Sequence, residues 1–295
     1  MILSKEDPNY RQCSISVMDN IADPEITFDE KGICNYYYEY IAAEKQFVFQ
    51  GEEGEKKFEE IITLIKSKGK GKKYDCILGV SGGVDSTYLA YLSKKVGLRV
   101  LCVHFDNGWN SELAVKNIQN IIEKCGFDLY TYVIDWEEFK DLQISYFNSG
   151  VVDLEAVNDL AIFLSLEKIC IEFKINYILD GRNVVTETTL PLAWINKDYQ
   201  NMLNIHERFG KLKLKSFPTI SRWKRNIIDF RNRYTKIMPL NFITYNKEEA
   251  KSLIKSEFNW VDYGGKHYES VFTRFYQGYI LPEKFKIDKR KPLFY

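Results

Sequence analysis

Short apolar runs alternate with helix-patterned stretches between residues 75 and 179, and this alternation constrains the fold more than any other feature. The apolar runs have the length and composition of buried strands, and the stretches between them repeat apolar residues at helical spacing. The strand-like runs are 75–80, 99–105, 129–134 and 177–179, and the helix-like stretches are 84–96, 111–124 and 154–174. Parallel strands need helical crossovers, so the pattern predicts an α/β fold with a doubly wound parallel sheet.

The rest of the chain divides around this alternating core. Residues 1–54 contain turn signals and are expected to form an irregular N-terminal segment. We expect an α/β domain over residues 55–190, beginning with a helix at 55–67. Strand signals fade after that, so residues 191–295 are predicted to be a mostly helical region rich in aromatic and basic residues.

The bulk composition describes an ordinary soluble protein. Of the 295 residues, 45% are hydrophobic and 28% are charged, and the net charge is zero. A neutral chain gives no electrostatic reason to expect a nucleic-acid or membrane partner. There is no signal-like start and no apolar run of the roughly 20 residues that span a bilayer. The six cysteines form no disulfide framework, so we expect a cytoplasmic protein.

The loop Ser81-Gly82-Gly83-Val84-Asp85-Ser86 joins the first strand of the core to its first helix. Its two glycines let the backbone approach an anion closely, and the helix presents free N–H groups and its positive dipole end. The serines add hydroxyl groups. Asp85 cannot favour an anion directly, so we expect it to act through Mg²⁺ or in structure. The loop therefore predicts a pyrophosphate cradle.

Two other phosphate-binding patterns do not fit this loop, and one structural alternative stays open. A Walker A loop needs a lysine directly after its second glycine, and no lysine follows Gly83. The Gly-x-Gly-x-x-Gly pattern of dinucleotide sites is also absent here. A plain strand-to-helix turn with a serine at the helix start remains the simplest alternative.

The hexapeptide resembles the signature of the PP-loop ATP pyrophosphatases, which include asparagine synthetases, GMP and NAD synthetases and tRNA-thiolating enzymes. Members transfer AMP to a carbonyl oxygen, release pyrophosphate and let a nucleophile displace AMP. The resemblance implies that this chain uses ATP and Mg²⁺. It also implies that the loop holds the β- and γ-phosphates through Ser81, Gly82, Gly83, Val84, Asp85 and Ser86.

Polar residues at two other strand ends are candidates for nucleotide contacts. His104 and Asp106 end the second strand, and Gly181 and Asn183 follow the fourth. Ligands bind at the carboxyl ends of the strands in such sheets, so these residues are expected to face the adenosine. A hydrogen-bonded strand histidine and a simple Asp-Gly turn remain open as alternatives.

Blocks near both ends of the chain carry a second, narrower resemblance. They are Tyr10–Cys13, Val17–Asp19, Asp23–Asp29 and Gly32–Asn35 near the start, and Asp262–Ser270, Phe272–Gln277, Leu281–Phe285 and Asp288–Arg290 near the end. Together they resemble the N-acetyl sugar amidotransferases of surface-polysaccharide and nonulosonic (pseudaminic and legionaminic) acid biosynthesis, across nearly the whole chain.

The C-terminal blocks place polar side chains among aromatic residues, which suits proton transfer and phosphate binding. We predict that the catalytic residues are Asp85, Lys266, His267, Glu269, Arg274 and Lys289, and that Lys284 and Arg290 contact the nucleotide. The segment with Lys284, Lys289 and Arg290 is expected to fold back over loop 81–86. A solvated helix face and a frayed basic tail remain the alternatives.

This resemblance implies conversion of an acetamido group into an acetamidino group on a nucleotide-linked or free N-acetylated sugar. Family members take ammonia from a separate glutaminase, so the resemblance also implies partner subunits resembling a glutaminase and a cyclase. The chain itself shows no glutaminase motif. Two other functions stay open. One is a tRNA-modifying PP-loop enzyme of the thiolating type, using basic segment 208–236, and the other is an inactive nucleotide-binding scaffold.

The zinc pattern of the amidotransferases is incomplete in this chain. Family members have Cys-x-x-Cys at two N-terminal positions, whereas here Ser16 and Tyr37 stand at the second position of each pair, leaving Cys13 and Cys34. We therefore predict a degenerate zinc ribbon, and elemental analysis of the purified protein should find no stoichiometric zinc. One zinc per chain would contradict this and would require replacement ligands.

Overall fold

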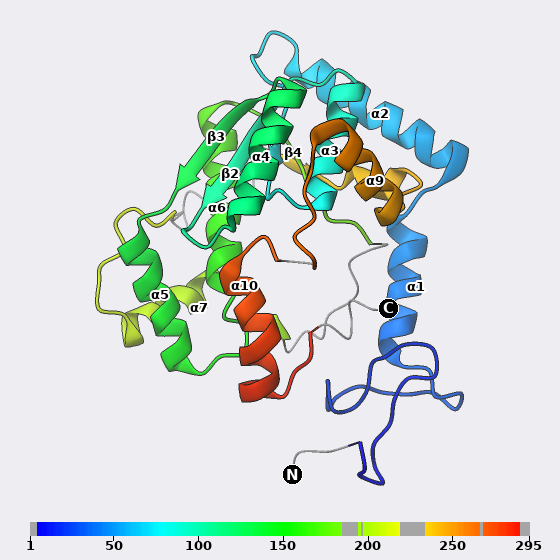
Figure 1. Cartoon of the computed structure of the whole chain (residues 1–295), viewed down its shortest axis with the longest axis vertical. Coiled ribbons are helices and arrows are strands. Elements are labelled where there is room, and N and C mark those ends of the chain that lie inside the picture. Colours follow the sequence, from blue (N-terminus) through cyan, green and yellow to red (C-terminus); the bar gives the residue numbers. More distant parts are fainter. Residues whose placement is uncertain (1–4, 185–193, 196, 219–233, 266–267, 290–295) are drawn as a thin grey trace.

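A computed structural model describes residues 5–184, 194–195, 197–218, 234–265 and 268–289 (Figure 1). Its centre is a five-stranded parallel sheet with the strand order β3-β2-β1-β4-β5. The strands are β1 (Cys76–Gly79), β2 (Val100–Asp106), β3 (Asp128–Val133), β4 (Tyr177–Leu179) and β5 (Thr235–Ile237). The predicted α/β fold with a doubly wound parallel sheet is confirmed.

Helices cover both faces of the sheet and extend beyond it. They are α1 (Asn35–Phe47), α2 (Gly51–Gly69), α3 (Val84–Lys95), α4 (Glu112–Cys125), α5 (Trp136–Ser149), α6 (Ala156–Glu172), α7 (Tyr199–Phe209), α9 (Lys247–Phe258) and α10 (Val271–Phe275), which continues as a π-helix (Tyr276–Phe285). The expected helical C-terminal region is thus present, and none of the described helices is long and apolar enough to cross a membrane.

Three elements depart from the sequence-based expectation, and one of them is the 14-residue helix α5, in a stretch for which no helix was predicted. The N-terminal segment, expected to be irregular, contains the 13-residue helix α1, which buries only Tyr36. Few apolar side chains mark a core face, so the periodicity of α1 is weak. The strand β5 was not foreseen because it has only three residues, none of them fully buried. It pairs with β4 at the sheet edge.

Alternating strand residues build the two layers of the core. Cys76 and Leu78 of β1 face one side and pack with the buried residues of α2, α3 and α4. Ile77 faces the other side and packs with Ile169 and Cys170 of α6. Side chains of a strand point to opposite faces in turn, so one buried strand contributes to both layers.

A small separate core holds the N-terminal segment together. It contains Cys13, Met18, Ile26, Cys34 and Tyr36. The backbone N–H of Cys34 donates to the sulfur of Cys13 over 3.3 Å, and the Ser16 hydroxyl lies 3.8 Å from the Cys34 sulfur. The two cysteines therefore meet, but among the described residues no three His, Cys, Asp or Glu side chains gather as a metal site.

Two carboxylates of α5, those of Asp141 and Glu138, accept backbone N–H groups of the segment that follows α7. Glu138 accepts the backbone N–H groups of Lys215, Ser216 and Phe217 at 2.9–3.1 Å. Burial alone would raise the pKa of Glu138, but these N–H donors stabilise the charged form and hold its pKa below the usual value. Its stabilising effect is therefore present at neutral pH and lost as the pH falls through the lowered pKa.

Replacing Glu138 by Gln should lower the free energy of unfolding by about 1–3 kcal/mol at pH 7, because an amide NH₂ would face backbone donors. The difference from wild type should shrink in acid, once the pH falls through the lowered pKa of Glu138 and the wild-type carboxylate also takes up a proton. Urea unfolding at neutral pH and in acid measures this. Glu137→Gln, at an exposed neighbour paired only with Lys140, should cost under about 0.5 kcal/mol. Equal losses in the two variants would contradict the assignment.

Candidate functional site

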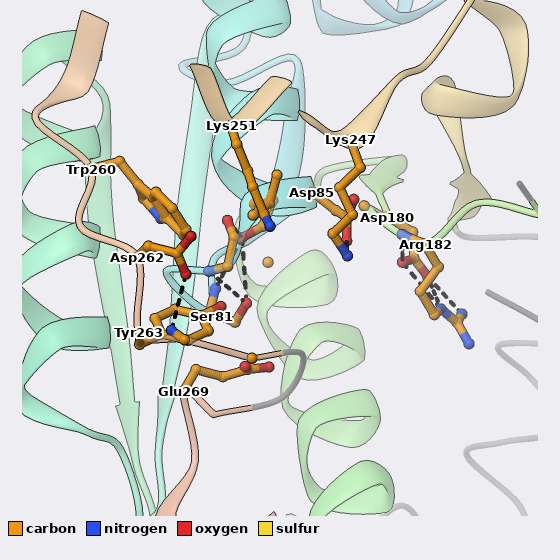
Figure 2. A pocket seen from close by; sticks show the side chains of 17 residues that line it. Ser81, Asp85, Asp180, Arg182, Lys247, Lys251, Trp260, Asp262, Tyr263 and Glu269 are labelled. Carbon is orange, nitrogen blue, oxygen red and sulfur yellow. Dashed lines mark hydrogen bonds and ion pairs between the residues drawn. The ribbon is translucent and has the colours of Figure 1, made fainter. Parts of the chain in front are cut away.

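A cavity of 410 Å³ lies at the carboxyl ends of β1 and β4 (Figure 2). The chain runs from β1 to β2 and β3 on one side and returns to β4 on the other, so this is where the strand order reverses. Open α/β sheets bind ligands at this switch point. The lining residues are Gly79, Ser81, Gly83, Val84, Asp85, Ser86, Asp180, Gly181, Arg182, Lys247, Lys251, Trp260, Asp262, Tyr263, Gly264, Gly265 and Glu269.

Loop 81–86 needs glycine at two positions for different reasons. Gly82 has a φ of +77°, and a Cβ there would lie 2.5 Å from the carbonyl oxygen of Ala114 in α4. A Cβ on Gly83 would lie 3.2 Å from both the Ser81 and the Tyr263 hydroxyl oxygens. A side chain at residue 82 would thus push the loop off α4, whereas one at residue 83 would narrow the cavity.

The loop satisfies its own donors only weakly. The Gly83 N–H donates to the Ser81 hydroxyl over 3.3 Å, and the Ser81 N–H to the Ser86 hydroxyl over 3.4 Å. Both bonds are long, so phosphate oxygens can replace them at little cost. Gly83 is the N-cap of α3 and has no side chain to accept the first-turn N–H groups of the helix. These features suit an anion, as the sequence predicted.

Asp85 is held in place from the first turn of α3. Its Oδ1 accepts a hydrogen bond from the Tyr245 hydroxyl, and its Oδ2 lies 3.7 Å from the Lys247 ammonium. Burial and the nearby Asp85 carboxylate raise the pKa of Tyr245, which therefore stays protonated and donating. A single positioned carboxylate beside a phosphate site is a suitable ligand for Mg²⁺, which usually keeps waters and phosphate oxygens as its other ligands.

Three cations that the sequence analysis did not select also line the cavity. Lys247 and Lys251 lie one turn apart on α9 and reach toward the loop (Figure 2). Arg182, which follows β4, forms a forked pair with Asp180 at 2.6–3.1 Å. The spacing of the lysines was visible in the sequence, but only the packing of α9 on α3 shows that they face the loop.

The segment between α9 and α10 forms the opposite wall of the cavity. The Trp260 indole N–H donates to the Gly82 carbonyl over 2.8 Å. Farther along, the Ser111 N–H donates to the Glu269 carbonyl over 2.8 Å, which fixes the segment to the start of α4. Burial and the neighbouring Glu269 raise the pKa of Tyr263. Glu269, expected to act in catalysis, therefore lies at the cavity with a protonated tyrosine beside it.

The structure brings some of the predicted site residues together and leaves others apart. Those at the cavity are Ser81, Gly83, Val84, Asp85, Ser86, Gly181 and Glu269, with Gly82 directly behind. His104 is buried and lies 3.3 Å from the Val80 carbonyl, and burial lowers its pKa. His104 is thus a buried strand histidine that is hydrogen-bonded to a neighbouring backbone carbonyl. Asp106 accepts the Gly108 N–H in a turn, and Asn183 is buried.

Three predicted C-terminal cations that the structure describes have their contacts away from the loop. Arg274 lies over the Tyr268 ring and Lys284 over the Phe285 ring, whereas Lys289 pairs with Glu155 at 3.4 Å. Glu155, at the start of α6, is buried and also accepts a hydrogen bond from the Gln277 amide. The two contacts attach the C-terminal segment to the start of α6. The remaining predicted residues, Lys266, His267 and Arg290, lie outside the described residues.

Comparison with known proteins finds similarity mainly in the segment that contains loop 81–86. Residues 75–194 match the family described as queuosine biosynthesis protein QueC. This segment is similar to PP-loop ATP pyrophosphatases. An uncharacterized protein of Methanocaldococcus jannaschii is 33% identical over 132 residues, which are 44% of this chain and 46% of the relative.

Two further relatives are synthases. A GMP synthase [glutamine-hydrolyzing] of Pyrobaculum aerophilum is 39% identical over 97 residues, 32% of this chain and 17% of that protein. A 7-cyano-7-deazaguanine synthase of Campylobacter jejuni is 33% identical over 91 residues, 31% of this chain and 39% of that protein. The chain thus spans less than half the length of each of these three relatives.

Lys251→Met should weaken binding of Mg²⁺-pyrophosphate by roughly tenfold or more, because a charge-assisted contact to a phosphate oxygen is lost. Isothermal titration calorimetry measures the dissociation constant. Lys124→Met is the control and should bind like wild type, since Lys124 is an exposed lysine in the last turn of α4 and does not line the cavity. If both variants bind like wild type, Lys251 does not contact the anion.

Proposed function

We propose that the protein is an ATP-dependent amidotransferase that converts the acetamido group of an N-acetylated sugar into an acetamidino group. The observation that carries the ATP-dependent part is the cavity at the strand-order reversal, where loop 81–86 faces Lys247, Lys251 and Arg182. The sugar rests on the resemblance of the N- and C-terminal blocks to N-acetyl sugar amidotransferases. The similar GMP synthase and 7-cyano-7-deazaguanine synthase support the part of the proposal that makes this protein a synthase.

The chemistry explains why such a site is needed. An amide carbonyl is a poor electrophile, so its oxygen attacks the α-phosphorus of ATP and pyrophosphate leaves. The resulting O-adenylyl imidate has a good leaving group. Ammonia then adds to the imidate carbon, AMP departs with the former carbonyl oxygen, and loss of a proton leaves the amidine. The second step forms one C–N bond and breaks one C–O bond.

The residues of the cavity have distinct tasks in this proposal. The first-turn N–H groups of α3 and the hydroxyls of Ser81 and Ser86 bind the departing pyrophosphate, whose charge grows in the transition state. Lys247 and Lys251 offset that charge from the opposite side. Asp85 would hold Mg²⁺, which supplies further charge neutralisation when bound. Glu269 is placed to accept a proton from ammonia or the sugar amide.

Two features extend the proposal to partners. The amidotransferases that the chain resembles take ammonia from a separate glutaminase, and a similar GMP synthase is named glutamine-hydrolyzing. We therefore propose that separate glutaminase and cyclase-like subunits supply ammonia to this chain. The tRNA-modifying and scaffold alternatives remain as outcomes of the test below.

The test is release of AMP and pyrophosphate from ATP with Mg²⁺ and ammonia, across a panel of free and nucleotide-linked diacetamido sugars, with tRNA and with no acceptor. We expect release only with a sugar, and a product whose mass differs by the exchange of O for NH. Gly83→Val, whose side chain would crowd the Ser81 and Tyr263 hydroxyls, should abolish release while the protein stays folded. Release with tRNA alone would favour the alternative enzyme, and no ATP binding the scaffold.

A further inference from the structure

The carbonyl oxygen of Gly82 is held by two side-chain donors from outside loop 81–86. It accepts the Trp260 indole N–H over 2.8 Å and the Asn117 amide NH₂ over 3.3 Å. Trp260 is 4% exposed and Asn117 is fully buried, so water does not compete for either bond. The donors come from α4 and from the segment after α9, and both converge on one oxygen behind the loop.

This arrangement sets the direction of the next donor. A peptide unit is planar and trans, so its N–H points away from its C=O. The Gly82 carbonyl faces Trp260 and Asn117, and the Gly83 N–H of the same peptide must therefore face the other way. There it meets the Ser81 hydroxyl over 3.3 Å, among the residues that line the cavity.

The loop itself does not fix this orientation. The peptide joins two glycines, and Gly82 already has a φ of +77°. Glycine accepts positive and negative φ almost equally, so rotation of this peptide is not opposed by side-chain sterics within the loop. A rotated peptide would aim its carbonyl oxygen at the phosphate and repel it. Donors outside the loop are needed to keep the N–H directed inward.

The two donors are themselves fixed. Asn117 exchanges two hydrogen bonds of 2.9 Å with the backbone of Val261, one given and one received. The amide of Asn120, one turn nearer the end of α4, donates to the Asn259 carbonyl over 3.1 Å. Trp260 thus stands between two residues that are tied to α4, and its indole nitrogen is held in front of Gly82.

We propose that Trp260 and Asn117 are positioning residues that orient the Gly82–Gly83 peptide for anion binding. The inference rests on the proposed pyrophosphate site but concerns residues that act through the backbone of the loop. Trp260 would matter for its indole N–H more than for its ring, and Asn117 for its NH₂ as well as for its bonds to Val261.

The decisive variant is Trp260→Phe, which keeps an aromatic ring and removes the donor. The control is Asn120→Ala, which loosens the same segment without touching Gly82. Binding of Mg²⁺-pyrophosphate is measured by calorimetry, and the Gly83 amide is followed by NMR in ¹⁵N-labelled protein. We expect about tenfold weaker binding in Trp260→Phe and a lost or reduced shift of the Gly83 amide on titration, with the melting temperature close to wild type. Asn120→Ala should bind within about twofold of wild type.

Should Trp260→Phe not fold, Asn117→Asp gives a second test, because it preserves the acceptor for the Val261 N–H and loses the donors to the Gly82 and Val261 carbonyls. It too should weaken pyrophosphate binding. Asn120→Asp, which adds the same charge one turn along α4 without touching Gly82, is its control. Wild-type affinity in either folded variant, or an equal loss in its Asn120 control, overturns the inference while the proposed function stands. Failure of the wild-type protein to bind pyrophosphate instead refutes the proposed site, and this inference with it.

Discussion

The close approach of Gly82 to α4 is the contact on which the site depends. A Cβ at this position would lie 2.5 Å from the Ala114 carbonyl oxygen, so only glycine lets the loop settle against the first turn of that helix. From there the loop enters α3 with its N–H groups facing the cavity. The far wall of the cavity is joined to the loop at the same residue, because Trp260 and Asn117 both donate to the Gly82 carbonyl.

The sequence predicts those parts of the site whose neighbours are close along the chain. The alternation of strands and helices and the loop Ser81–Ser86 are local patterns, and both are present as expected. Trp260 could not be selected because its partner Gly82 is 178 residues away. Likewise, Lys247 and Lys251 are ordinary surface lysines of an amphipathic helix until α9 is packed on α3. Lys289 was expected to lie near the phosphates, yet it forms an ion pair with the buried Glu155, and no local sequence pattern predicts that pair.

The charges of the cavity favour an anion that arrives with its own cation. Among the described residues that line the cavity, the cations are Arg182, Lys247 and Lys251, and the carboxylates are those of Asp85, Asp180, Asp262 and Glu269. Several of these charges are already paired within the cavity, as Arg182 is with Asp180. A bare polyphosphate would therefore meet little net attraction, whereas the same polyphosphate carrying Mg²⁺ would bring the missing positive charge to Asp85. This balance is a physical reason to expect Mg²⁺ that does not depend on any resemblance.

The C-terminal segment has a structural task beside its proposed chemical one. The residues before α10 are fixed to the start of α4 by backbone bonds, and the Val271 N–H donates to the Trp109 carbonyl over 2.9 Å. Beyond α10, the Tyr276 hydroxyl donates to the Val152 carbonyl over 2.7 Å, just before α6. The segment therefore spans from α4 to α6 across the carboxyl edge of the sheet. Glu269 and the residues around Tyr263 line the cavity from this segment, so under the proposed function the stretch before α10 is where contacts that select the acceptor would form.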